Sequence, residues 1–217
     1  MNLLILRDPE DAAKRRDIKS KLALDIDDTI VGITHSVIKL AEIKFGIKGD
    51  SRYFNEKGIT NSQYLECYRE LWFEHTDELK PLIEEKRLIQ LIEIAGSIDF
   101  VTARDSSFSK PLESWFRSNF PNIIERSKVI ILDRLSLDMH GYAKLMLGHK
   151  IIIDDSPSFL KDYALKRLKD SNQRLILIKR WNDISYSSIS SNDNVFLVND
   201  INEAIDKAEE LLKGIMH

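Results

Sequence analysis

Five short apolar runs in the second half of the chain constrain its fold most. Each has four or five residues and is rich in β-branched side chains. Their hydrophobicity is continuous along the run, whereas a half-exposed strand would alternate between apolar and polar residues, and continuous runs are typical of strands buried on both faces. We therefore expect a parallel sheet. The runs cover residues 98–102, 129–132, 151–154, 175–178 and 195–198.

Helical patterns separate several of these runs, and a further short apolar strand precedes them all at residues 22–24. Strands that alternate with helices predict βαβ units. We expect an α/β fold with a doubly wound, Rossmann-like parallel sheet. The expected helices between the strands cover residues 108–120, 141–147, 158–169 and 201–212.

The segment between the first two predicted strands, residues 33–95, has helical periodicity and no clear strand pattern. Gly46 is placed to end a first helix, and Thr60 and Gln63 form a capping box before a second. A third helix is expected to open near Pro81. We therefore predict a small all-helical domain inserted after the first strand.

The rest of the chain, residues 1–32 and 96–217, is then predicted to form the α/β core around this insert. Asp8 and Pro9 indicate a further helix start near the N-terminus, with Asp at the N-cap and Pro at the first helical position. The 217 residues suffice for one sizeable core with a small accessory domain.

Three carboxylates and a hydroxyl follow the strand at residues 22–24: Asp25, Asp27, Asp28 and Thr29. Residues i and i+2 of an extended segment point the same way, so Asp25 and Asp27 can face one site. Two carboxylates about 4 Å apart repel by about 4 kcal/mol at an effective dielectric constant near 20. A cation, a proton or a functional demand must offset this repulsion, and we expect Asp28 to be structural.

Two later strands also end in polar residues. Thr102 closes one strand, and Asp154 and Asp155 close another. Because ligand sites of open parallel sheets lie at the carboxyl ends of the strands, these groups are expected to meet at one edge. Oxygen ligands of this kind suit Mg²⁺. A carboxylate can act as a nucleophile toward phosphorus, and a second can move the proton, while Thr102 and Lys144 could contact the phosphoryl oxygens.

This layout resembles the haloacid dehalogenase superfamily of phosphatases. The first motif of that family, Asp-x-Asp-x-Thr, matches residues 25–29, its second motif matches a strand ending at Thr102, and its fourth matches Asp154 and Asp155. The resemblance implies an aspartyl-phosphate mechanism with Asp25 as nucleophile and Asp27 as general acid and base.

The same resemblance implies the remaining site residues. Thr102 and Lys144 would hold the phosphoryl group. Thr29 and Arg104 are candidate substrate contacts, and an exposed Arg104 paired with Glu or Asp is the alternative. Asp25, the backbone carbonyl of Asp27, and Asp154 or Asp155 would bind Mg²⁺. Many relatives carry the lysine of the third motif one helical turn earlier, where this chain has His140, so both His140 and Lys144 remain candidates for that role.

Within the superfamily the insert corresponds to a cap, which favours small phosphorylated metabolites as substrates. The chain looks most like the type C 5′(3′)-deoxyribonucleotidases in three places: the Ile-Asp-Asp-Ser-Pro form of the fourth motif, the spacing of Lys144, and residues 179–182 (Lys-Arg-Trp-Asn). The resemblance therefore implies a phosphatase of nucleoside monophosphates. A phosphatase of sugar phosphates or other small metabolites, and a non-catalytic phosphate- or metal-binding protein, remain the alternatives.

Composition and charge limit the kinds of partner and the cellular location that we expect. The formal net charge is −3, so bulk electrostatics indicate neither a nucleic-acid nor a membrane partner. Cys67 is the one cysteine, which excludes an intrachain disulfide and favours a reducing compartment. The apolar start, residues 1–6, is too short for the core of a signal peptide. We expect a cytoplasmic location and leave a homodimer open.

Overall fold

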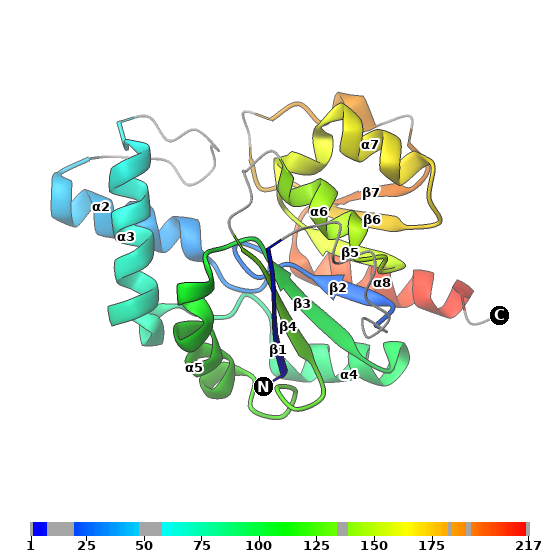
Figure 1. Ribbon diagram of the computed structural model, residues 1–217, viewed down its shortest axis with the longest axis horizontal. Coiled ribbons are helices and arrows are strands. Elements are labelled where there is room, and N and C mark those ends of the chain that lie inside the picture. The colour runs from blue at the N-terminus through cyan, green and yellow to red at the C-terminus, as the bar shows by residue number, and fades with distance from the viewer. Residues whose placement is uncertain are drawn as a thin grey trace.

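The computed structural model describes residues 2–7, 20–47, 58–133, 139–181, 184–189 and 192–215. These residues form a seven-stranded sheet in which all neighbouring strands are parallel, in the order β1-β4-β3-β2-β5-β6-β7 (Figure 1). The predicted α/β fold with a parallel sheet is confirmed. The strands are β1 (Asn2–Leu6), β2 (Leu22–Leu24), β3 (Ile98–Thr102), β4 (Lys128–Leu132), β5 (Ile151–Asp154), β6 (Arg174–Ile178) and β7 (Val195–Val198).

Helices cover both faces of this sheet. The helices α4 (Glu85–Ala95), α5 (Ser109–Asn119) and α8 (Ile201–Ile215) pack into one apolar cluster with one face of the strands. The opposite face packs with α6 (His140–Met146) and α7 (Asp162–Lys169). Short 3₁₀ turns complete the order: η1 (Thr76–Glu78), η2 (Ser106–Phe108), η4 (Pro157–Leu160) and η5 (Ser187–Ile189).

The strand β2 shows why a central strand of this sheet has a continuous apolar sequence. In β2, Leu22 and Leu24 belong to one cluster while Ala23, between them, belongs to the other. All three are buried. A strand covered by helices on both faces buries every side chain, so an alternating pattern would place polar groups in one of the two cores.

The strand β1 was not predicted. It pairs in parallel with β4 at the edge of the sheet, and only Leu6 of its side chains is buried. Residues 3–6 form a continuous apolar run of four like those of the other strands, although this edge strand is half-exposed. The helical insert therefore follows the second strand of the chain, β2. The helix start predicted at Asp8 lies outside the described residues.

The first two predicted helices of the insert are present as α2 (Ile33–Phe45) and α3 (Asn61–Glu74). Gly46 ends α2 with a φ of 66°, a conformation that glycine adopts without strain. Thr60 and Gln63 form the predicted capping box of α3. We call α2 and α3 the cap helices. They lie side by side at one end of the sheet (Figure 1).

The third predicted helix, α4, differs from the prediction in its start and its place. It begins at Glu85, because Pro81 and Leu82 pair with the turn after β2: Leu82 N donates to Ile30 O over 2.8 Å. The buried residues of α4 pack with α8 beneath the sheet, away from the cap helices. The domain limits at residues 33 and 95 stay a prediction, and the last helix within them belongs to the packing of the core.

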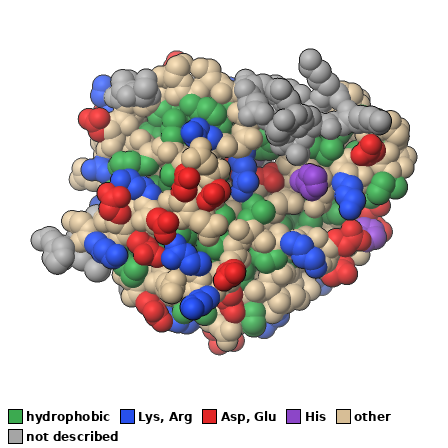
Figure 2. Space-filling model, turned by 180° about the vertical axis from the view of Figure 1, so that it is seen from behind, with side chains coloured by type: hydrophobic (Ala, Val, Ile, Leu, Met, Phe, Trp, Pro, Cys, Tyr) green, Lys and Arg blue, Asp and Glu red, His purple; other side chains and the backbone are tan. Residues whose placement is uncertain are grey.

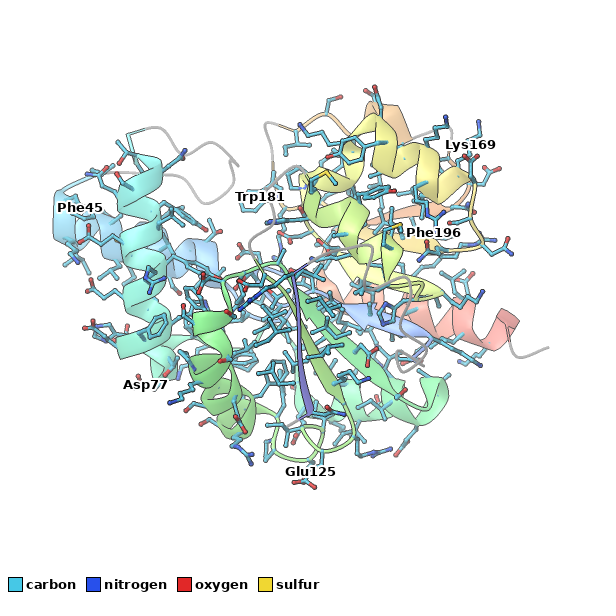
Figure 3. All side chains as sticks on the ribbon, in the orientation of Figure 1. Phe45, Asp77, Glu125, Lys169, Trp181 and Phe196 are labelled. Atoms are coloured by element: carbon cyan, nitrogen blue, oxygen red, sulfur yellow. The ribbon has the colours of Figure 1, made fainter. Side chains whose placement is uncertain are left out.

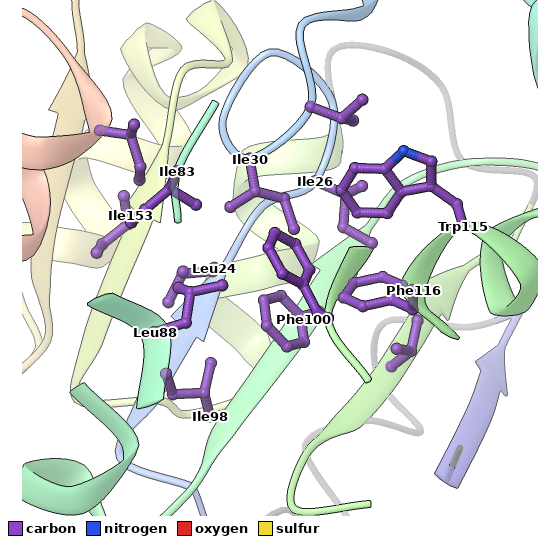
Figure 4. Packing of buried hydrophobic residues seen from close by; sticks show 14 of the residues in the cluster. Leu24, Ile26, Ile30, Ile83, Leu88, Ile98, Phe100, Trp115, Phe116 and Ile153 are labelled. Carbon is purple, nitrogen blue, oxygen red and sulfur yellow. The ribbon is translucent and has the colours of Figure 1, made fainter. Parts of the chain in front are cut away.

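Aromatic side chains join the cap helices to the core. Phe100 of β3 and Phe116 of α5 lie with their ring centroids 4.8 Å apart, beside Trp115 (Figure 4). Trp115 in turn meets Trp72 of α3 at 6.2 Å and donates its indole N–H to Leu79 O over 2.7 Å. The apolar cluster therefore runs without a break from the sheet into α3.

Candidate active site

The site lies where the order of the strands reverses. From β2, the next strands in the chain, β3 and β4, lie on one side, and β5, β6 and β7 lie on the other. In an open α/β sheet this switch point leaves a crevice at the carboxyl ends of the strands. Asp25 follows β2, Thr102 ends β3 and Asp154 ends β5, so the topology brings these residues to the crevice, as predicted.

Lys144 lies between two of the carboxylates. Its Nζ is 2.5 Å from Asp25 Oδ1 and 2.5 Å from Asp154 Oδ2, and its side chain is 4% exposed. The second oxygen of Asp154 accepts a hydrogen bond from Ser156 N over 2.8 Å. Each oxygen of Asp154 thus accepts one hydrogen bond, whereas among the described residues only Oδ1 of Asp25 does.

Asp155 completes an acidic cluster with Asp25 and Asp154. One carboxylate oxygen of each lies within 4.8 Å of those of the other two. Three carboxylates and the ammonium of Lys144 together leave two negative charges, which a divalent cation would balance. In the described part of the chain no donor hydrogen-bonds to the Asp155 carboxylate. A hard cation with oxygen ligands, such as Mg²⁺, fits this donor set.

The raised pKa values of Asp25 and Asp155 also indicate that a cation would stabilise this cluster. Burial raises the pKa of Asp25 to about 7, because Asp154 and Asp27 add to the effect of desolvation more than the ion pair with Lys144 can offset. Burial, together with the carboxylates of Asp28, Asp25 and Asp154, raises the pKa of Asp155 well above its usual range. Without a cation, the negative charge of this cluster is therefore disfavoured.

Asp27 occupies a different environment from the acidic cluster. Its Oδ2 accepts a hydrogen bond from the Tyr68 hydroxyl over 2.9 Å and pairs with Arg104 Nη2 at 2.5 Å. Its Oδ1 is buried and has no hydrogen-bond partner among the described residues. The Asp27 side chain is absent from the acidic cluster, so the carboxylate itself is not placed as a metal ligand.

Arg104 was predicted to contact the substrate, and the structure gives its guanidinium two protein partners. Besides Asp27, it contacts Thr102, whose Oγ1 accepts a hydrogen bond from Arg104 Nε over 3.0 Å. The arginine side chain is only 3% exposed. Arg104 therefore connects the two residues expected to act on the phosphoryl group and its leaving oxygen.

Thr29 does not reach the site. It is fully buried, its Oγ1 has no hydrogen-bond partner among the described residues, and it does not line the cavity described below. The turn after β2 folds back, with Ile30 N and Val31 N both donating to Ile26 O over 3.0 Å, and this turns Thr29 inward. Thr29 is therefore not placed to contact a substrate in the cavity.

Asp28 has a structural role, as expected. Its carboxylate accepts hydrogen bonds from Thr34 N at 3.0 Å and from Thr34 Oγ1 at 2.5 Å, at the start of α2. The residue has a φ of 54°, a conformation that Asp tolerates better than most side chains. Asp28 therefore fixes the point at which the chain leaves the core for the cap helices.

Both candidates for the third motif come from one element. His140 and Lys144 lie on α6, one turn apart, and both line the cavity. Only Lys144 forms ion pairs with Asp25 and Asp154. Gly141 lets α6 approach η4 closely, since a Cβ there would lie 2.8 Å from Phe159 N. This close approach brings the next turn of α6, with Lys144, to the carboxylates.

A cavity of about 760 Å³ opens over these groups. Asp25, Asp27, Asp155, Thr102 and Lys144 line its floor, and the cap helix α3 supplies much of its other side. Trp181, from the loop after β6, lies between the cap helices and α6 (Figure 3). The remaining aromatic and cationic lining residues are Tyr64, Tyr68, Arg69, Arg104 and Phe108.

Tyr68 is a site residue whose main contact the sequence did not reveal. Tyr64 and Tyr68 are one helical turn apart, a spacing that places both on one face of α3. That spacing was the one available signal that they share a site. The pairing of Tyr68 with Asp27 spans 41 residues of sequence and has no local signature.

Comparisons with known proteins leave the family open. No family model matches the chain. It is 26% identical over 155 residues to vacuolar protein sorting-associated protein 54 of Saccharomyces cerevisiae, a match that covers 67% of this chain but spans only 17% of the length of that protein. A haloacid dehalogenase-like family hydrolase from Xanthomonas campestris has a TM-score of 0.45 and 10% identity, over 88% of this chain and 96% of the other.

The surface adds two findings. On the visible part of the face in Figure 2, acidic and basic side chains are interspersed, and neither sign forms a continuous field. Among the described helices, none combines the length and the apolar character that a membrane span requires. The cytoplasmic location, the homodimer and the absence of nucleic-acid partners stay predictions.

Proposed function

We propose that this chain is a Mg²⁺-dependent phosphomonoester hydrolase of the haloacid dehalogenase type that acts on nucleoside monophosphates. The observation that carries the proposal is the convergence of Asp25, Asp154 and Asp155 with Lys144 at the switch point of the sheet. Metal-assisted phosphoryl transfer requires carboxylate ligands for a cation next to a cavity that can hold the substrate.

Asp25, Asp155 and Asp154 would hold the Mg²⁺. When bound, the cation would neutralise charge on the carboxylates and on the phosphoryl oxygens of the substrate. The protein supplies further positive charge and a donor at the same place, because the Lys144 ammonium and the Thr102 hydroxyl belong to the floor of the cavity.

Asp25 is the nucleophile in this proposal. Lys144 engages its Oδ1, so Oδ2 attacks phosphorus and a new P–O bond forms. The bond from phosphorus to the ester oxygen breaks, and that oxygen takes a proton from Asp27. Water then attacks the aspartyl-phosphate and gives a proton back to Asp27. The acyl-phosphate P–O bond breaks, which releases inorganic phosphate and regenerates the Asp25 carboxylate.

The cavity favours a substrate with a planar, polarisable leaving group. Its volume of about 760 Å³ lies within the usual range for small-molecule sites. Tyr64, Tyr68, Phe108 and Trp181 line it, and rings of this kind can stack on a nucleobase. These residues support a nucleoside monophosphate over a small sugar phosphate.

The test is a panel of phosphate esters assayed with Mg²⁺ and the full chain. It contains purine and pyrimidine nucleoside monophosphates, hexose and pentose phosphates, and p-nitrophenyl phosphate. We expect turnover of nucleoside monophosphates with kcat/KM at least tenfold above the sugar phosphates. A higher kcat/KM for sugar phosphates would contradict a nucleotide substrate but would still support a phosphatase activity.

The variant Asp25→Asn tests the mechanism, with Asp206→Asn as the matched control. Asp206 carries the same carboxyl group on the exposed side of α8, where its side chain is 71% exposed. We expect Asp25→Asn to lower kcat by at least about 10³-fold, because no other carboxylate oxygen can take its place, and Asp206→Asn to keep wild-type activity. Mg²⁺ binding by the wild type without any hydrolysis would instead support the non-catalytic alternative.

A further inference from the structure

Two donors from different parts of the chain hold the same oxygen of Asp27. The Tyr68 hydroxyl lies 2.9 Å from Oδ2, and Arg104 Nη2 lies 2.5 Å from it. The other oxygen, Oδ1, is free of partners among the described residues. Because both donors act on Oδ2, they fix the orientation of the carboxylate, whose side chain is 26% exposed and lines the cavity.

Arg104 is itself held in place by aromatic rings. Its guanidinium carbon lies 4.4 Å from the ring centroid of Trp72 and 5.9 Å from that of Tyr68, both on α3. Phe108 lies on another side at 5.7 Å. A guanidinium over aromatic faces is stabilised by the ring quadrupole, more strongly when it is desolvated, as this one is. The helix α3 therefore holds both donors to Asp27.

We propose that Tyr68 and Arg104 are positioning residues that hold the Asp27 carboxylate toward the leaving oxygen of the substrate, and that the cap helix α3 thereby makes the acid and base group competent. This inference rests on the proposed function. Tyr68 is suited to the task because its hydroxyl donates to Asp27 Oδ2 over 2.9 Å, and both side chains line the cavity.

A chemical consequence follows for the leaving group. An alkoxide is strongly basic and must be protonated as it departs, whereas p-nitrophenolate departs without a proton. A defect in the orientation of Asp27 therefore slows alkyl phosphates much more than p-nitrophenyl phosphate. Because kcat/KM includes the departure of the leaving group but not the later attack of water, it isolates this step.

The experiment measures kcat/KM of Tyr68→Phe for p-nitrophenyl phosphate and for the best nucleoside monophosphate of the panel. We expect about a ten- to hundredfold loss on the nucleotide, since positioning accounts for part of a general-acid effect of about 10²- to 10⁴-fold. On p-nitrophenyl phosphate we expect less than threefold loss. A purely structural role for the hydroxyl would lower both values by the same factor.

Tyr163→Phe is the control. It removes the same hydroxyl from a ring on α7 that is 39% exposed and lies outside the cavity. We expect the ratio of the two kcat/KM values to stay within twofold of the wild-type ratio. Thermal unfolding of both variants checks that the cap helices remain folded.

The possible failures can be told apart. If the wild type hydrolyses both esters, Asp25→Asn abolishes this, and Tyr68→Phe leaves the ratio unchanged, the positioning role is overturned and the proposed function stands. If the wild type hydrolyses neither ester, or Asp25→Asn keeps full activity, the proposed function fails and the positioning role fails with it.

Discussion

At the scale of single residues, Lys144 governs the electrostatics of the site. Its ammonium pairs with both Asp25 and Asp154, and all three groups are buried. Removing any one of these charges therefore lowers the stability of the folded protein. Removing one partner of a buried pair typically costs about 3–5 kcal/mol, because the other charge stays buried without compensation. The neighbouring carboxylates raise the pKa of Lys144, so the ammonium stays charged.

Asp28 provides a prediction about pH. Burial, more than any other effect, raises its pKa from 3.8 to about 6 in the folded protein. The folded state therefore binds this proton more tightly than the unfolded state does. The stabilisation that follows from this is complete at low pH and is lost as pH rises through about 6.

The variant Asp28→Asn removes the charge but keeps an oxygen that can accept from Thr34 N. We expect it to raise the free energy of unfolding by about 1 kcal/mol more at pH 8 than at pH 5. Urea unfolding at the two pH values measures this difference, with Asp206→Asn as an exposed control. An equal change at both pH values would contradict the raised pKa.

At the scale of secondary-structure elements, the close approach of α6 to η4 places the lysine. Gly141 is the second residue of α6, and its N–H donates to Ser158 Oγ over 2.8 Å. A methyl group at residue 141 would meet the backbone of Phe159, which cannot move aside as a flexible side chain could. The position of Lys144 thus depends on a glycine in the preceding turn of the same helix.

We predict that Gly141→Ala lowers the free energy of unfolding by about 1–3 kcal/mol, because the added carbon forces two elements apart. The control is Gly214→Ala in α8, where an added Cβ meets no atom within 4 Å. There we expect a change within about 1 kcal/mol, toward stabilisation, since alanine favours a helix over glycine. Equal stability of the two variants would show that α6 and η4 can separate freely.

At the scale of the whole molecule, stability is unevenly distributed between the sheet and the cap helices. The central strands β2, β3 and β5 are buried on both faces, whereas α2 keeps exposed apolar positions, among them Ile43 at 74% exposure. Buried apolar contact and shielded backbone hydrogen bonds set the free energy of local opening.

We predict that amides of α2 exchange with solvent through openings of lower free energy than amides of β2, β3 and β5. Hydrogen exchange at increasing urea concentrations measures this by segment. The central strands should exchange only through global unfolding. If α2 exchanged with the same free energy and the same urea dependence as β2, the cap helices and the sheet would unfold as one unit.

Much of this structure was encoded locally. Continuous apolar runs predicted six of the seven strands, and five of these are covered on both faces, whereas the edge strand β7 is half-exposed. The capping box at Thr60 and the glycine at residue 46 fixed the ends of the cap helices. The edge strand β1 also has a continuous apolar run, residues 3–6, but so short a run does not by itself distinguish a strand from other structure.

The sequence by itself determined that Asp25, Thr102 and Asp154 meet, since the ends of parallel strands share one edge of a sheet. The tertiary structure alone decided which group partners each of them. Only the fold shows that Arg104 pairs with Asp27 across 77 residues, that Tyr68 reaches the same oxygen from α3, and that α4 packs under the sheet. The physical reason is that the local order of apolar and polar residues indicates which side chains are buried. Hydrogen bonds between distant side chains depend instead on how the packed elements meet.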